Sequence, residues 1–145
     1  DNYLEIIKNR LYNPKDKQEK ESAQFTLHNS LLTILKLFAP IMPHITEELY
    51  QAHFKNYEKK KSIHLTFWPK YDSKLINKKL EKEGEEVIEI ISKIRHFKTS
   101  NQKSLKEEII LTLPIKYKDS EFLQDLKAVS NAKEIKFGYD LNISF

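Results

Sequence analysis

Hydrophobic residues recur at intervals of three and four over most of the first hundred positions of the chain. This spacing places apolar side chains on one face of a helix. It predicts helices over residues 3–12, 22–39, 43–56 and 75–98. Between positions 31 and 39 only Thr33 and Lys36 are polar, so we expect the second helix to be buried on more than one side. Pro40 ends this helix and Pro43 starts the next one.

The last forty residues change from a helical to a strand-like period. Ile109, Leu111, Leu113 and Ile115 have the two-residue spacing of a strand, and residues 122–129 repeat as a helix. From residue 135 to 145 every odd position is apolar, which predicts one strand, or two strands that turn near Gly138. A strand-helix-strand unit of this size cannot bury enough surface alone. We therefore expect it to dock against the long helix 75–98.

The predicted fold is thus mainly α. An antiparallel helical bundle over residues 1–103 is followed by a small strand-helix-strand (α/β) appendage, residues 104–145, docked on the bundle. Within the bundle, residues 63–68 alternate like a short extended segment with Trp68 as a packing anchor. Gly84 lies at a core-facing position of the long helix. Because glycine costs about 1 kcal/mol there relative to alanine, we expect it to permit close approach of a neighbouring helix.

Composition excludes several classes of function. The 145 residues include no cysteine and two glycines, so there is no thiolate chemistry and no glycine-rich phosphate loop within this chain. No apolar run is long enough to cross a bilayer and no signal peptide is evident, so we expect a cytoplasmic protein without a membrane partner. The chain starts without methionine and at once enters a helical pattern, so we expect a segment of a longer protein.

The charge distribution is more informative than the net charge of +4. Residues 81–89 carry five glutamates and one lysine, whereas residues 92–106 carry five basic residues, one histidine and no acid. A surface that binds RNA has this character, with cations for phosphates and planar groups for unpaired bases. Acids early and bases late in a helix also complement its dipole without any ligand. Composition leaves both interpretations open.

Four stretches carry a resemblance to a known family. They are YLEIIKNRLYN at residues 3–13, APIMPHITEELYQ at 39–51, SIHLTFWP at 62–69 and VIEIISKIRHFKTSNQKSL at 87–105. Together they resemble the anticodon-binding helical domain of the class I aminoacyl-tRNA synthetases for valine, isoleucine and leucine, over roughly residues 1–105. The last stretch and PHITEELYQ look most like the valine enzymes, whereas YLEIIKNRLY is shared with the isoleucine enzymes.

The resemblance implies a parent enzyme that activates an amino acid with ATP and magnesium and transfers it to tRNA. Neither the HIGH-like nor the KMSKS-like motif of its catalytic domain occurs here. This segment would therefore hold no cofactor and no catalytic residue. Its partners would be the anticodon stem-loop of tRNA and the catalytic domain of the same parent chain.

The resemblance also points to RNA-binding residues. Arg95 and Lys98 match basic positions of the family motif, and Arg95 is the leading candidate for direct contact with RNA. Lys93, His96 and Lys103 are weaker candidates, and Lys36 is a further one.

Three alternatives stay open at this point. The same domain of an isoleucine or leucine enzyme would share most of these motifs. A non-catalytic protein–protein interaction domain would use the strand-helix-strand segment to dock a partner. A metal-dependent enzyme would use His44 with Glu47 or Glu48, although acids in the first turns of a helix also stabilise its N-terminus without metal.

Overall fold

The computed structural model describes residues 2–145. Its elements are α1 (Asn2–Tyr12), α2 (Lys17–Phe38), α3 (Pro43–His53), α4 (Lys55–Glu58), α5 (Lys78–Ser100), β1 (Ile109–Pro114), α6 (Leu123–Ser130), β2 (Ala132–Gly138) and β3 (Asn142–Ser144), with single 3₁₀ turns at Ile63–Leu65, Ser73–Leu75 and Ile115–Tyr117. Contacts divide the chain into two compact units. Unit 1 comprises residues 1–15 and 77–145, and unit 2 comprises residues 16–76.

The predicted fold class is confirmed: the chain is mainly α with a small strand-containing region near its end. The two contact units differ from the expected segments 1–103 and 104–145, because α1 and α5 belong to the same unit as the sheet. Those segments stay a prediction about how the chain is organised. Across residues 2–145, no helix combines the length and the apolar character that a membrane crossing needs.

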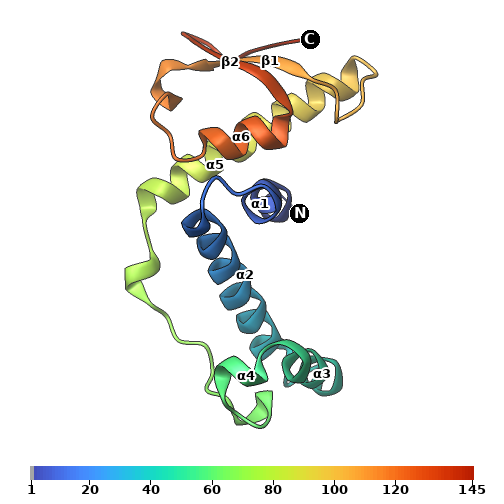
Figure 1. Ribbon diagram of the computed structural model, residues 1–145, viewed down its shortest axis with the longest axis vertical. Coiled ribbons are helices and arrows are strands. Elements are labelled where there is room, and N and C mark those ends of the chain that lie inside the picture. The colour runs from blue at the N-terminus through green and yellow to red at the C-terminus, as the bar shows by residue number, and fades with distance from the viewer. Residues whose placement is uncertain (1) are drawn as a thin grey trace. The chain divides into compact units, whose positions relative to one another are not determined.

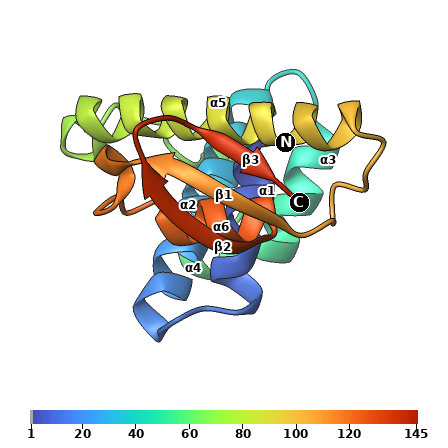
Figure 2. The same ribbon diagram turned by 90° about the horizontal axis from the view of Figure 1, so that it is seen from above.

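Unit 1 contains a three-stranded sheet with β1 at its centre (Figure 2). β1 is parallel to β2, which it reaches through α6, and antiparallel to β3. Of the two arrangements predicted for residues 135–145, the structure has the one with two strands, because β2 ends at Gly138 and β3 begins at Asn142. α6 runs alongside α5 beneath the sheet (Figure 1).

The core of unit 1 confirms that the strand-helix-strand segment docks on the long helix. One stripe of α5 faces the sheet and α6, and its partners are apolar residues of β1, α6 and β2. The stripe consists of Val87, Ile90, Ile91 and Ile94, packed against Ile109, Leu111, Leu113, Leu126 and Ala132. Burial of each valine, leucine or isoleucine side chain in this set stabilises the unit by about 1.5–3 kcal/mol, so this interface holds the sheet in place.

Gly84 in α5 does not serve the purpose expected from the sequence. A Cβ atom added there would meet Cζ of Phe122 at 3.9 Å, which is ordinary van der Waals contact. Within residues 2–145, no helix approaches Gly84 so closely that only glycine fits, and the expectation of a close approach is wrong.

Replacement of this glycine should therefore stabilise the protein. Gly84→Ala should raise the free energy of unfolding by about 0.5–1 kcal/mol, because alanine restricts the unfolded chain and favours the helix. Urea unfolding followed by circular dichroism measures this. Gly138→Ala is the control without an expected gain, since its Cβ would lie 3.1 Å from Cγ2 of Thr112. A loss of stability in Gly84→Ala would contradict the packing described here.

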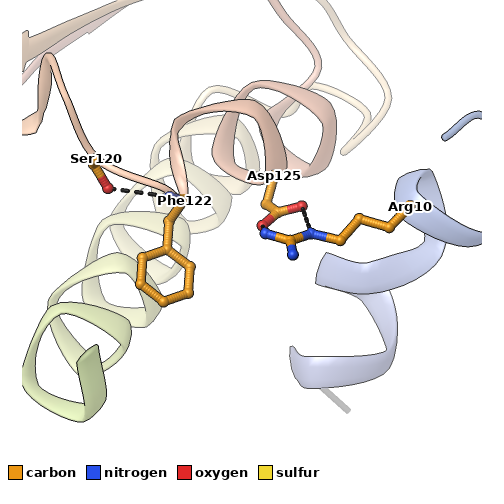
Figure 3. A network of polar contacts seen from close by, with 4 residues as sticks. All are labelled: Arg10, Ser120, Phe122 and Asp125. Carbon is orange, nitrogen blue, oxygen red and sulfur yellow. Dashed lines mark hydrogen bonds and ion pairs between the residues drawn. The ribbon is translucent and has the colours of Figure 1, made fainter. Parts of the chain in front are cut away.

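An ion pair between a partly exposed arginine and a buried carboxylate joins α1 to α6 (Figure 3). Asp125 is 1% exposed, and Arg10 donates from Nε to its Oδ1 at 2.7 Å and from Nη2 to its Oδ2. Just before α6, the amide of Phe122 donates to Oγ of Ser120 at 3.2 Å. Because a carboxylate inside a protein must be paired, this contact determines where α1 lies on unit 1.

Loss of the arginine should be costly. Arg10→Met leaves the Asp125 carboxylate buried without its guanidinium, so we expect the free energy of unfolding to fall by about 3 kcal/mol. Lys8→Met is the control, because Lys8 pairs with Glu5 on the exposed surface of the same helix, and such pairs contribute about 0–1 kcal/mol. Equal effects of the two substitutions in urea unfolding would show that the pair at Asp125 is not structural.

Unit 2 is built on α2, α3 and the 3₁₀ turn at residues 63–65. Asp16 caps α2 by accepting from the amide of Glu19 at 2.8 Å, so the helix starts five residues earlier than expected. The core of the unit consists of Leu32, Leu35, Ala39, Tyr50, Phe54 and Ile63. Other apolar positions of α2 are exposed, among them Ile34 at 50% and Phe38 at 47%. The expected burial of α2 on more than one side is not observed.

The segment after α4 also differs from its prediction. It forms a 3₁₀ turn at Ile63–Leu65 instead of an extended segment. Ile63 is the buried anchor at 2% exposure, whereas Trp68 is 59% and Phe67 is 78% exposed. Trp68 is therefore a surface residue in this structure.

Candidate nucleic-acid interface

Unit 1 has a cavity of about 440 Å³ where α1 meets the second half of α5, the segment after α5 and the end of α6. Four of the lining residues are basic and one is acidic. The lining polar and charged residues are Glu5, Lys8, Asn9, Tyr12, Asn13, Arg95, Lys98, Lys106 and Ser130. The cavity thus joins two of the predicted RNA-binding residues, Arg95 and Lys98, to residues of α1.

Arg95 lies at the edge of the packed stripe of α5. It follows the buried Ile94 directly, so its side chain leaves the core at the cavity wall and is only partly exposed. Its Nη1 donates to Oδ1 of Asn2 at 2.8 Å. A guanidinium offers five donors, and the contact with Asn2 uses one of them.

Lys98 has a different place from the one its charge suggests. It is 1% exposed, and its Nζ donates to the carbonyl oxygens of Leu105 at 2.9 Å, Glu107 at 2.6 Å and Ser130 at 2.8 Å. Burial lowers the pKa of the Lys98 ammonium, and the charge of Glu107 partly opposes that shift. All three of its donors are used inside unit 1, so we assign Lys98 a structural role and leave it out of the interface.

This assignment predicts a large effect on stability. Lys98→Met would leave three carbonyl groups at this buried site without their donor, and we expect the free energy of unfolding to fall by about 3 kcal/mol. Lys93→Met, on the exposed surface of α5, should change it by less than about 0.5 kcal/mol. Thermal unfolding of both variants distinguishes these outcomes. A stable Lys98→Met protein with weakened RNA binding would restore Lys98 to the interface.

The residues of α1 were not identified as candidates from the sequence. Lys8, Asn9 and Tyr12 of α1 form one wall of the cavity together with Asn13, which directly follows the helix. Their spacing of one, three and one positions places them on one helical face, and that polar face was the available signal. The hydrogen bond from Lys8 lowers the pKa of the Glu5 carboxyl, and the charge of Arg95 adds to this effect. The lining residues still carry a net positive charge, because four of them are basic and one is acidic.

The other predicted residues lie elsewhere. Lys93 lines a separate cavity beside Glu86 and Glu89, and Nδ1 of His96 lies 3.4 Å from Oγ of Ser100.

Lys103 and Lys36 are engaged in contacts of their own. The ammonium of Lys103 is 5.6 Å from the ring centroid of Phe145, whose ring stacks on Phe97 with centroids 5.0 Å apart. Lys36 belongs to unit 2, where its Nζ pairs with Glu58 at 2.9 Å.

The metal-site alternative gains no support from α3. One oxygen of Glu47 accepts from Nε2 of Gln51 at 2.5 Å, and the other accepts from Oγ of Ser62 and the amide of Ile63. These contacts lower the pKa of Glu47 despite its partial burial. Among residues 2–145, no three histidine, aspartate or glutamate side chains come together as metal ligands.

The cavity at α1 and α5 has the chemistry of a site for an anionic polymer with planar groups. Arg95, Lys8 and Lys106 supply positive charge, and the ring of Tyr12 is 78% exposed. The side-chain amides of Asn9 and Asn13 offer both donors and acceptors, as the edges of bases require.

Comparison with known proteins agrees with this chemistry. A family model described as the anticodon-binding domain of tRNA ligase matches residues 1–113. The chain is 34% identical over 140 residues to a valine–tRNA ligase of Pyrococcus abyssi, and the match covers 94% of this chain and 16% of that protein. It is 40% identical over 142 residues to a valine–tRNA ligase of Rickettsia felis, with coverages of 94% and 16%. The chain thus spans about one sixth of the length of these relatives.

Proposed function

Because the chain belongs to the family of anticodon-binding domains of tRNA ligases, we propose that it recognises the anticodon stem-loop of tRNA as part of a valine–tRNA ligase. The observation that carries this proposal is the basic cavity between α1 and α5. It combines a guanidinium, an exposed ring and two side-chain amides within one unit of the fold.

The proposed recognition uses unpaired bases of the loop. A splayed base would stack on the exposed ring of Tyr12, and its pairing edge would contact Arg95, Asn9 or Asn13. Lys8 and Lys106 would hold the neighbouring phosphates. Bases of a loop are accessible to such contacts because they are not paired with one another.

The chemistry of the parent enzyme belongs to this proposal as well. With two glycines and no glycine-rich phosphate loop, these 145 residues do not fit an ATP site. The catalytic domain of the longer chain would bind ATP and magnesium and join valine to the tRNA. We also propose that the protein is located in the cytoplasm. The absence of cysteine is compatible with the reducing conditions there.

Two alternatives have separate support. The isoleucine and leucine enzymes share motifs with this chain, although the relatives described above carry the name valine–tRNA ligase. A protein-interaction role for the end of the chain is favoured by Tyr139, which is 93% exposed, and Phe137, which is 37% exposed. Ile135, Leu141 and Ile143 nearby pack on the core instead.

Binding of tRNA by Arg95 variants tests the proposal. Arg95→Ala should weaken binding of a valine-accepting tRNA about tenfold at low salt, because a bidentate contact to a base contributes about 1–3 kcal/mol. Arg95→Lys should also bind this tRNA weakly, since lysine lacks the planar guanidinium that makes a bidentate contact. Filter binding against salt concentration measures both.

The matched control is Lys93→Ala, which removes an exposed charge of the same helix outside this cavity. It should reduce binding less than twofold. Binding of the unsubstituted protein is also measured with an isoleucine-accepting tRNA and with a valine tRNA that has an altered anticodon loop. If both bind as tightly as the valine tRNA, anticodon recognition by this segment is wrong.

A further inference from the structure

Unit 2 presents two aromatic rings and three lysines on the segment that follows α4. Phe67 is 78% and Trp68 is 59% exposed. Lys59, Lys60 and Lys61 are exposed as well, and in the part of the chain that the structure describes no carboxylate pairs with them. We call these five residues the aromatic–lysine surface.

Hydrogen bonds from α3 fix the backbone of this surface. The hydroxyl of Tyr50 donates to the carbonyl of Lys60 at 3.1 Å, and Nε2 of Gln51 donates to the carbonyl of Lys61 at 2.5 Å. Glu47 accepts from Oγ of Ser62 at 2.8 Å and from the next amide at 3.0 Å. The lysine side chains therefore project from a rigid segment, so less ordering is needed when a ligand binds.

A small cavity of about 140 Å³ adjoins the two rings. Lys36 and His64 contribute to its lining, and the ammonium of Lys60 lies 5.9 Å from the ring centroid of Phe67. The volume is well below the roughly 300–1,000 Å³ of pockets that enclose a free small molecule. It suits one planar group of a polymer whose remainder stays on the surface.

We propose that the aromatic–lysine surface is a second RNA contact of this chain. An unpaired nucleotide stacks on Trp68 or Phe67, and the flanking phosphates contact Lys59, Lys60 and Lys61. Exposed rings beside a run of cations are the arrangement by which proteins hold single strands without reading their sequence. An acidic peptide would use the lysines but would leave the two rings without a planar partner, so the exposed rings favour RNA.

The single tryptophan of the chain makes this proposal directly measurable, because all tryptophan fluorescence comes from Trp68. The full 145-residue protein is titrated with a tRNA transcript and with single-stranded oligouridine. We expect saturable quenching of the fluorescence by both, with an affinity that falls steeply as salt rises. Absence of quenching at low salt, while filter binding shows that the RNA is bound, would overturn the proposal.

Ring and charge variants test the two parts of the surface. Phe67→Ala should weaken oligouridine binding about tenfold, which is within the range for loss of one stacked base. Phe25→Ala is the matched control, because Phe25 is a phenylalanine of unit 2 that is 62% exposed and lies outside the aromatic–lysine surface. It should leave the affinity unchanged, and equal losses in the two variants would contradict stacking at Phe67.

The triple change of Lys59, Lys60 and Lys61 to glutamine should make the plot of log affinity against log salt less steep by about two. Each of the three lost phosphate contacts contributes about 0.7 to the steepness. A control protein with Lys78, Lys79 and Lys133 changed to glutamine loses the same net charge from exposed positions of unit 1. If both proteins show the same slope, the lysine run has no special part and the proposal is wrong.

Two further comparisons separate the alternatives. Polyglutamate should not quench Trp68, and quenching equal to that by oligouridine would overturn RNA binding in favour of contact with an acidic protein. Arg95→Ala should leave quenching by oligouridine unchanged even where it weakens tRNA binding. Failure of anticodon recognition and failure of the aromatic–lysine surface are thus distinguishable.

Discussion

The buried carboxylate of Asp125 has to be neutralised, and Arg10 is the group that pairs with it. This one requirement brings α1 against α6, and the position of α1 in turn supplies a wall of the basic cavity. The ammonium of Lys98 acts similarly on the opposite wall, since it joins the end of α5 to the following segment and to the end of α6. The apolar core holds α5 to the sheet, but these two buried charges shape the cavity.

The spacing of apolar residues predicted most elements of this fold, because helices and strands each place their buried side chains at a fixed interval along the chain. The stripe of α5 and the alternation of β1 correspond to faces that are buried in the structure. Starts of helices were less accurate, since Asp16 caps α2 well before its apolar stripe begins. Ion pairs between residues far apart in the sequence could not be predicted from this spacing. Arg10 and Asp125 are 115 positions apart, and nothing local to either residue indicates the other.

In the candidate site too, features that depend on neighbouring residues in the sequence were predicted, whereas contacts between distant segments were not. The basic character of Arg95 and its place at the end of the long helix were evident from the sequence, and so was the family resemblance. The sequence did not indicate that the ammonium of Lys98 donates all its hydrogen bonds to backbone carbonyls. The three acceptors belong to segments outside α5. Trp68 was expected in the core on the grounds that tryptophan is usually buried. In unit 2 the shorter Ile63 takes that place.

The order of the segments has a consequence for synthesis on the ribosome. Unit 2 is one continuous stretch, residues 16–76, whereas unit 1 needs both ends of the chain. Domains fold as units while the chain emerges, so unit 2 can reach its structure first. α1 is synthesised before the other elements described here, whereas the Asp125 carboxylate that Arg10 contacts follows 115 positions later. Closing so long a loop is a late and slow event in folding, so unit 1 is expected to form after unit 2.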